Sequence, residues 1–221
     1  MAVDLNLHAV IGPLVLSALA VPALVLCEYR LYRPGRYLFK PLAAMAFLWL
    51  AIAAGATGSV YGQWILAGLV CCMAGDLLLM PDSERWFLAG LFAFLCGHLC
   101  YALGFLSLDY SLAGLALSSL PAMALMVLSL RWLLPHLDST MKAPVLLYTL
   151  VITGMLLCAG VSAAQPGAGL IISGAWGFAL SDLAVARQQF VRPSPVNGLW
   201  GLPLYFISQM LLAASVATVH S

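Results

Sequence analysis

Charged residues are scarce in this sequence: only 8% of its 221 residues are Asp, Glu, Lys or Arg. Soluble domains carry roughly 25% charged residues, so the chain falls far outside their range. Hydrophobic residues make up 64% of the chain, and the mean hydropathy is +1.04. A soluble fold of this size has no interior large enough to hide so much apolar surface. The scarcity of charge therefore excludes a soluble protein and indicates that lipid is the solvent.

The sequence also has almost no net charge and no segment that resembles a linker between domains. The formal net charge is only +1, which argues against nucleic acid as a partner. No Ser/Gly/Pro-rich linker and no low-complexity tract divides the sequence. We therefore expect residues 1–221 to form a single integral membrane domain, with membrane lipids around it.

Motifs that bind metals or form disulfides are missing from the cysteine pattern. The six cysteines are Cys27, Cys71, Cys72, Cys96, Cys100 and Cys158. None belongs to a CxxC pair, and none lies near histidines at a zinc-like spacing. We interpret all of them as reduced packing residues, and we expect neither a metal nor a cofactor.

Long apolar runs are what the sequence has in abundance. Eight can be drawn: His8–Cys27, Pro41–Gly55, Gly62–Met80, Arg85–Leu106, Leu112–Leu134, Ala143–Ala163, Ala168–Phe190 and Trp200–Val219. A helix needs about 20 residues to cross a bilayer, and only the second run is short. That run could extend through Thr57–Val60. The sequence thus predicts an all-α, polytopic bundle of about eight transmembrane helices.

The basic residues provide a test of this map. They are Arg30, Arg33, Arg36, Lys40, Arg85, Arg131, Lys142, Arg187 and Arg192. With eight helices, all of them fall in or beside the connections 1–2, 3–4, 5–6 and 7–8. The positive-inside rule then places these connections in the cytoplasm and both termini outside. We expect the membrane to be a bacterial inner membrane.

Two acidic residues remain inside the apolar runs after the loop charges are set aside. They are Asp76 and Asp182, on the third and seventh expected helices. An ionisable group in a transmembrane helix costs at least ~2.5–3.5 kcal/mol by insertion scales. Two of them on different helices suggest a shared interior site. The alternative is that each is protonated and only hydrogen-bonds a neighbouring helix.

The expected topology gathers further polar residues in the same half of the membrane as the aspartates. These residues are Lys40, Tyr148, Tyr205 and Gln209. Tyr205 and Gln209 share one helix face at a spacing of i, i+4. Each also has a simpler interpretation. The tyrosines could belong to an interfacial belt, Lys40 could meet anionic lipid, and Gln209 could bridge helices.

The fourth expected helix carries a second set of residues. Phe94, His98 and Tyr101 share a face near its middle, and His98 could carry a proton or be structural. Gly90, Gly97 and Gly104 recur every seven residues and predict a smooth strip for close helix contact.

An ordered set of fragments spans nearly the whole chain. It comprises Lys40-Pro41, Gly75-Asp76-Leu77-Leu78-Leu79, Gly90 to Tyr101 with Phe94, Gly97 and His98, Gly174-Ala175, Ser181-Asp182, and Tyr205-Phe206-Ile207-Ser208-Gln209. This set resembles the YhhN-type lysoplasmalogenase family of integral membrane alkenyl ether hydrolases. The resemblance implies eight transmembrane helices and a lysophospholipid substrate. It also implies hydrolysis of the vinyl ether bond of lysoplasmalogens, giving a fatty aldehyde and glycerophospho-ethanolamine or -choline.

The implied reaction matches the residues. Protonation of the vinyl β-carbon gives an oxocarbenium ion, to which water adds before the hemiacetal collapses. Glycosidases meet similar needs with one protonated and one ionised carboxyl group, so Asp76 and Asp182 are the candidate catalytic pair, in either order. Supporting roles fall to Lys40, Tyr148, Tyr205, Gln209, His98, Tyr101 and Ser181. Lys40 or Arg85 could hold the phosphate.

Two other functions use the same aspartates. A proton-coupled small-molecule or lipid transporter could use them as carriers, although no internal repeat or pair of broken helices is visible. A non-catalytic lipid-binding or assembly protein could use them only to lock its helices together. Lysolipid turnover in detergent, without any gradient, separates an enzyme from a transporter.

Overall fold

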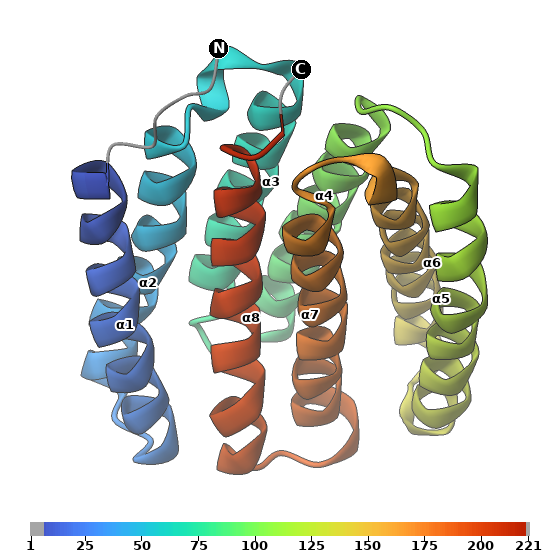
Figure 1. The fold of residues 1–221 in the computed structure, drawn as a ribbon. Helices are drawn as coiled ribbons and strands as arrows, with labels where there is room; N and C mark the ends of the chain where they lie inside the picture. Colours follow the sequence, from blue (N-terminus) through green and yellow to red (C-terminus); the bar gives the residue numbers. More distant parts are fainter. Residues whose placement is uncertain (1–6, 220–221) are drawn as a thin grey trace.

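The computed structural model of the chain describes residues 7–219 and is built from helices (Figure 1). The long helices are α1 Leu7–Tyr29, α2 Arg33–Ala53, α3 Val60–Leu78, α4 Glu84–Leu106, α5 Leu112–Leu133, α6 Ser139–Val161, α7 Ala168–Ala186 and α8 Pro195–Ser215. Short 3-10 turns follow α2, α5 and α6, and a π-helical turn, Arg187–Val191, extends α7. Each predicted apolar run corresponds to one long helix.

Eight spans of 19 to 26 residues within residues 7–219 are apolar and long enough to cross a bilayer. The chain is therefore a multi-pass integral membrane protein. Consecutive helices alternate in direction, so α1 begins and α8 ends at the same end of the bundle (Figure 1). The connections α1–α2, α3–α4, α5–α6 and α7–α8 lie at the opposite end. We call that end the basic end, because all nine basic residues lie in or near these connections.

The second helix is longer than the sequence predicts. It starts at Arg33 instead of Pro41 and ends at Ala53, so the proposed extension to Val60 is wrong. Pro34 does not break the helix because it lies in the first turn, where its missing N–H leaves no helical bond unmade. Gly55 ends this region with φ 86°, a left-handed conformation that glycine adopts easily.

Helices α6 and α8 also begin about one turn earlier than predicted, at Ser139 and Pro195. In α8, the Ser194 hydroxyl accepts a bond from the Val196 amide, and Pro195 occupies the first turn. Tyr205 and Gln209 consequently lie deeper in the span than a helix start at Trp200 predicts. Proline next to polar residues is also typical of loops, which is why the sequence places both starts too late.

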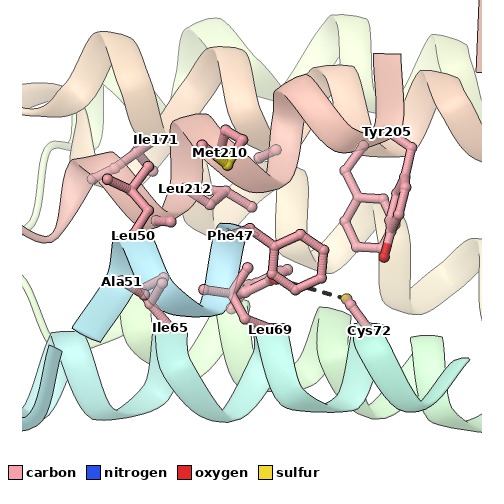
Figure 2. Packing of buried hydrophobic residues seen from close by; sticks show 14 of the residues in the cluster. Phe47, Leu50, Ala51, Ile65, Leu69, Cys72, Ile171, Tyr205, Met210 and Leu212 are labelled. Atoms are coloured by element: carbon pink, nitrogen blue, oxygen red, sulfur yellow. Dashed lines mark hydrogen bonds between the residues drawn. The ribbon is translucent and has the colours of Figure 1, made fainter. Parts of the chain in front are cut away.

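The core lies between α2, α3, α7 and α8, with α8 in contact with α1, α2, α3 and α7. Figure 2 shows its side chains, among them Phe47, Leu50, Ala51, Ile65, Leu69, Cys72, Ile171, Tyr205, Met210 and Leu212. Large apolar residues elsewhere face outward: Leu112, Leu117 and Leu120 of α5 are each about 80% exposed. An apolar exterior of this kind is what a helix bundle presents to lipid chains.

The predicted glycine strip of α4 packs against α3. A β-carbon at Gly97 would lie 2.8 Å from the Cys72 sulfur, and one at Gly90 would lie 2.7 Å from Leu79. These glycines let the two backbones approach closely, which is the role predicted for them. The close contact also places Phe94 of α4 against Gly75, the residue before Asp76.

Candidate active site

The two intramembrane aspartates line the same cavity, of about 430 Å³, near the basic end. Asp76 lies in the last turn of α3, and Asp182 lies about one turn before the end of α7 at Ala186. Asp76 is 2% exposed, and the Asp182 side chain is 14% exposed. The sequence placed both acids inside the bilayer, and the structure brings them to one space.

Asp76 is paired with a cation. The Lys40 Nζ atom lies 3.3 Å from Asp76 Oδ1, and the Tyr205 hydroxyl donates a 2.7 Å hydrogen bond to Oδ2. Lys40 is in the second turn of α2, because that helix starts earlier than predicted. Burial opposes the ionised form of this carboxyl group, whereas the Lys40 ammonium and the Tyr205 hydroxyl both favour it.

Asp182 has different partners. The Tyr148 hydroxyl donates a 3.0 Å hydrogen bond to Asp182 Oδ2, and His98 Nε2 approaches the same oxygen to 3.4 Å. The His98 approach lacks hydrogen-bond geometry, so Nε2 has no bonded partner. Asp182 thus faces an imidazole where Asp76 faces an ammonium group.

The orientation of the His98 ring determines its protonation pattern. His98 Nδ1 lies 2.8 Å from the backbone carbonyl oxygen of Phe94, one turn earlier on α4. A carbonyl oxygen only accepts hydrogen bonds, so Nδ1 carries a hydrogen. The nitrogen that faces Asp182 is therefore the one that is free to accept or release a proton.

Aromatic rings of the core pack against this polar site. Phe178 stacks on His98 with ring centroids 4.2 Å apart, and Phe94 meets Tyr205 edge to face at 5.9 Å. Sequence reasoning did not select Phe178. The sequence does contain a signal for Phe178: it lies at i, i+4 from Asp182 on α7, and residues at that spacing share a helix face.

Tyr101 and Gln209 form a separate buried pair. The Tyr101 hydroxyl donates to Gln209 Oε1 and lies 3.6 Å from the Cys72 sulfur. Neither side chain bonds an aspartate, and Gln209 Nε2 has no partner among the described residues. Ser181 lines the cavity, but its hydroxyl donates to the Phe178 carbonyl within its own helix. These three residues support the surroundings of the site.

Two charged residues that the sequence did not single out also line the cavity wall. Arg36 lies on α2, and its Nε atom is 2.7 Å from a carboxylate oxygen of Glu28 at the end of α1. Both line the cavity, together with Gln188 and Gln189 of the π-helical turn. Arg85, the alternative phosphate partner, is exposed and is not part of the wall.

A second, narrow cavity of about 70 Å³ meets the first at Asp182. Its walls are almost entirely apolar and come mainly from α4, α5, α6 and α7. Leu79, Phe87, Phe94, Asp182 and Val185 line both cavities. We call the larger cavity the polar arm and the narrow one the apolar arm. No cluster of three or more potential metal ligands occurs in the part of the chain that the structure describes.

Fold and site together define a class: a multi-pass membrane protein whose buried acidic site joins a polar and an apolar arm. A cavity of this kind is complementary to an amphiphile, which has a polar head and an apolar chain. The YhhN family model matches residues 35–216, and the chain belongs to that family.

Curated relatives of this chain are enzymes by name. Lysoplasmalogenase TMEM86B of Homo sapiens is 30% identical over 79% of this chain and 70% of its own length. The Mus musculus protein of the same name is 34% identical over the same shares, and lysoplasmalogenase TMEM86A of Homo sapiens is 31% identical over 76% and 72%. No solved structure matches this fold significantly.

Proposed function

We propose that this member of the YhhN family hydrolyses the vinyl ether bond of lysoplasmalogens, the substrates named by its relatives. The products are a fatty aldehyde and a glycerophospho-headgroup. One observation carries the proposal: two aspartates from different helices open into one cavity, each with its own partner. The runner-up, a proton-coupled transporter, has no comparable support from the relatives.

The two arms set the orientation of the substrate. The alkenyl chain enters the apolar arm, and the glycerol and phosphate occupy the polar arm, beside Lys40. The vinyl ether, which joins the chain to glycerol, then lies where the arms meet, at Asp182. A bond positioned in this way is held next to both carboxyl groups before any chemistry begins.

Asp182 is the proton donor in this mechanism. His98 Nε2 lies 3.4 Å from a carboxylate oxygen of Asp182, close enough for the two groups to share one proton. With that proton on Asp182, its hydroxyl delivers it to the β-carbon of the vinyl ether. The double-bond electrons form the new C–H bond, and the ether oxygen shares the positive charge as an oxocarbenium ion.

Asp76 is the base. Its carboxylate, held by Lys40 and Tyr205, stabilises the oxocarbenium ion and takes a proton from the water that adds to it. When the hemiacetal collapses, Asp76 returns this proton to the departing glycerol oxygen. The hemiacetal hydroxyl gives its proton to Asp182 as the aldehyde forms. Both carboxyl groups finish in their starting states, and one water molecule is consumed.

Aldehyde release from an alkenyl lysophosphatidylethanolamine by the purified protein in detergent tests this function. We expect turnover by the wild type and a loss of about 100-fold or more in Asp76→Asn and in Asp182→Asn, because general acid and base groups contribute that much. Asp82→Asn is the matched control. Asp82 pairs with Arg33 at the exposed basic end, and its loss should leave turnover unchanged.

Full activity in either buried variant would remove that aspartate from the mechanism. A folded wild type that releases no aldehyde from any lysolipid would contradict the proposal. Proton-driven uptake into vesicles, abolished by the same variants, would then favour a transporter.

We also propose that the membrane is a bacterial inner membrane and that the basic end faces the cytoplasm. The gathering of all nine basic residues at that end supports this orientation. The polar arm then opens at the inner leaflet, where a lysolipid can enter sideways.

A further inference from the structure

The outer part of the polar arm contains an ion pair that the hydrolytic mechanism does not use. Arg36 and Lys40 lie at i, i+4 on α2 and therefore share a face, about 6 Å apart along the helix axis. Lys40 pairs inward with Asp76, while Arg36 pairs with Glu28. The charges of this wall thus run outward from the aspartates in the order Lys40, Arg36, Glu28.

Glu28 is held against the cavity wall by a neighbouring helix. A β-carbon at Gly198 of α8 would lie 2.8 Å from Glu28 Cγ, so the side chain rests directly on that glycine. The Glu28 side chain lines the polar arm. Both side chains of this ion pair remain partly open to solvent, 25% for Arg36 and 29% for Glu28. Such a pair contributes only modestly to stability, so each residue can exchange its partner for a ligand.

A zwitterionic headgroup has the complementary order of charges. In a lysolipid the glycerol separates the ether oxygen from the phosphate, and a two-carbon chain places the amine beyond it. With the vinyl ether at the aspartates, the phosphate falls beside Lys40 and Arg36. We propose that Glu28 then accepts hydrogen bonds from the primary ammonium of an ethanolamine headgroup, so that the site prefers ethanolamine to choline. This inference rests on the proposed function.

Choline lacks the features that this wall recognises. Its nitrogen has no N–H donors, and proteins usually bind it against several aromatic faces. The aromatic residues that line the polar arm are Phe87, Phe94 and Tyr205 among the described residues. Two of them also line the apolar arm, and Tyr205 bonds Asp76, so all three belong to the inner part of the cavity. The amides of Gln188, Gln189 and Asn197, with Glu28, form the outer wall.

Steady-state kinetics on two alkenyl lysolipids that differ only in the headgroup test the inference. We expect wild-type kcat/KM to be about ten-fold higher for the ethanolamine substrate than for the choline substrate. A charge-assisted hydrogen bond contributes a preference of about this size. Glu28→Gln should lower kcat/KM for ethanolamine by about the same factor and leave choline unchanged. The Arg36→Gln variant is the matched control: it breaks the same ion pair, but it should weaken both substrates equally through their shared phosphate.

Equal wild-type rates for the two substrates, or an equal loss of both in Glu28→Gln, would overturn the headgroup assignment. Binding of saturated ether analogues, which cannot be cleaved, separates this proposal from the hydrolase. Wild type should bind the ethanolamine analogue more tightly than the choline one by titration calorimetry, and Glu28→Gln should remove the difference. If this holds without any aldehyde release, only the proposed reaction fails. If aldehyde is released without any headgroup preference, only the role of Glu28 fails.

Discussion

Tyr205 gives the sharpest test at the scale of single residues, because its hydroxyl and Lys40 are the polar partners of Asp76. Tyr205→Phe keeps the ring against Phe94 and removes only the hydroxyl. A hydrogen bond to a charged group is worth ~1.5–3 kcal/mol, so we expect kcat to fall by about 10- to 100-fold. Aldehyde release at saturating substrate measures the change.

Tyr61→Phe is the control for this variant. The Tyr61 hydroxyl shares a 2.6 Å hydrogen bond with Ser215, buried toward the other end of the bundle. Its removal should lower the melting temperature and leave kcat intact. A comparable loss of kcat in both variants would mean that Tyr205 acts through stability and not through Asp76.

The position of deuterium in the product shows directly which atom of the substrate is protonated. If Asp182 delivers a solvent-exchangeable proton to the β-carbon, turnover in D2O should be slower than in H2O. The aldehyde should also carry one deuterium on the carbon next to its carbonyl, as mass spectrometry detects. An aldehyde formed without deuterium at that carbon would rule out carbon protonation, because no other step of the mechanism adds hydrogen there.

Part of this site could be predicted from residue types alone. Asp76, Asp182 and His98 stood out because ionisable groups are costly in lipid. The Glu28–Arg36 pair did not stand out, because charges near a helix end have no such cost and look like loop residues. The sequence does not distinguish the acid from the base, and the assignment proposed above rests on the surroundings of His98 and on the Lys40 contact.

At the scale of helices, the contact between α3 and α4 positions Asp76. A β-carbon at Gly75 would lie 2.7 Å from the Phe94 ring, which itself packs on Tyr205. Gly75→Ala should displace that ring and disturb Asp76, lowering kcat/KM by about ten-fold or more. Overpacking should also cost about 1–3 kcal/mol of stability. Aldehyde release and thermal unfolding measure the two effects.

Gly154→Ala is the matched control on α6, where an added β-carbon meets no atom within 4 Å. Neither activity nor melting temperature should fall in this variant. If Gly75→Ala lost stability yet kept full kcat/KM, the packing of α3 on α4 would not control the geometry of the site.

Helix number was predictable from the sequence, whereas several helix starts were not. Eight apolar runs separated by turn residues are a strong signal, because each must be long enough to cross the bilayer. The starts at Arg33, Ser139 and Pro195 were missed because polar residues and proline occur in first turns as readily as in loops. This error placed Lys40 at a helix end and Tyr205 too close to the surface.

The whole molecule is polarised along the membrane normal. One end of the bundle holds the polar arm, the Glu28–Arg36 pair and all nine basic residues. The helices that connect these basic segments are apolar. A lysolipid in the facing leaflet has its headgroup at that level and its chain at the level of the apolar arm. The orientation of the bundle therefore decides which leaflet supplies the substrate.

Reporter fusions in a bacterial host measure this orientation. Alkaline phosphatase is active only outside the cytoplasm, where its disulfides form. We expect activity when it follows Ser221 and none when it is inserted at Asp138 in the α5–α6 connection, because basic connections stay inside. A fluorescent protein that folds only in the cytoplasm should give the opposite pattern. If phosphatase is active at Asp138 instead, the basic end faces outward, and the site draws its substrate from the outer leaflet.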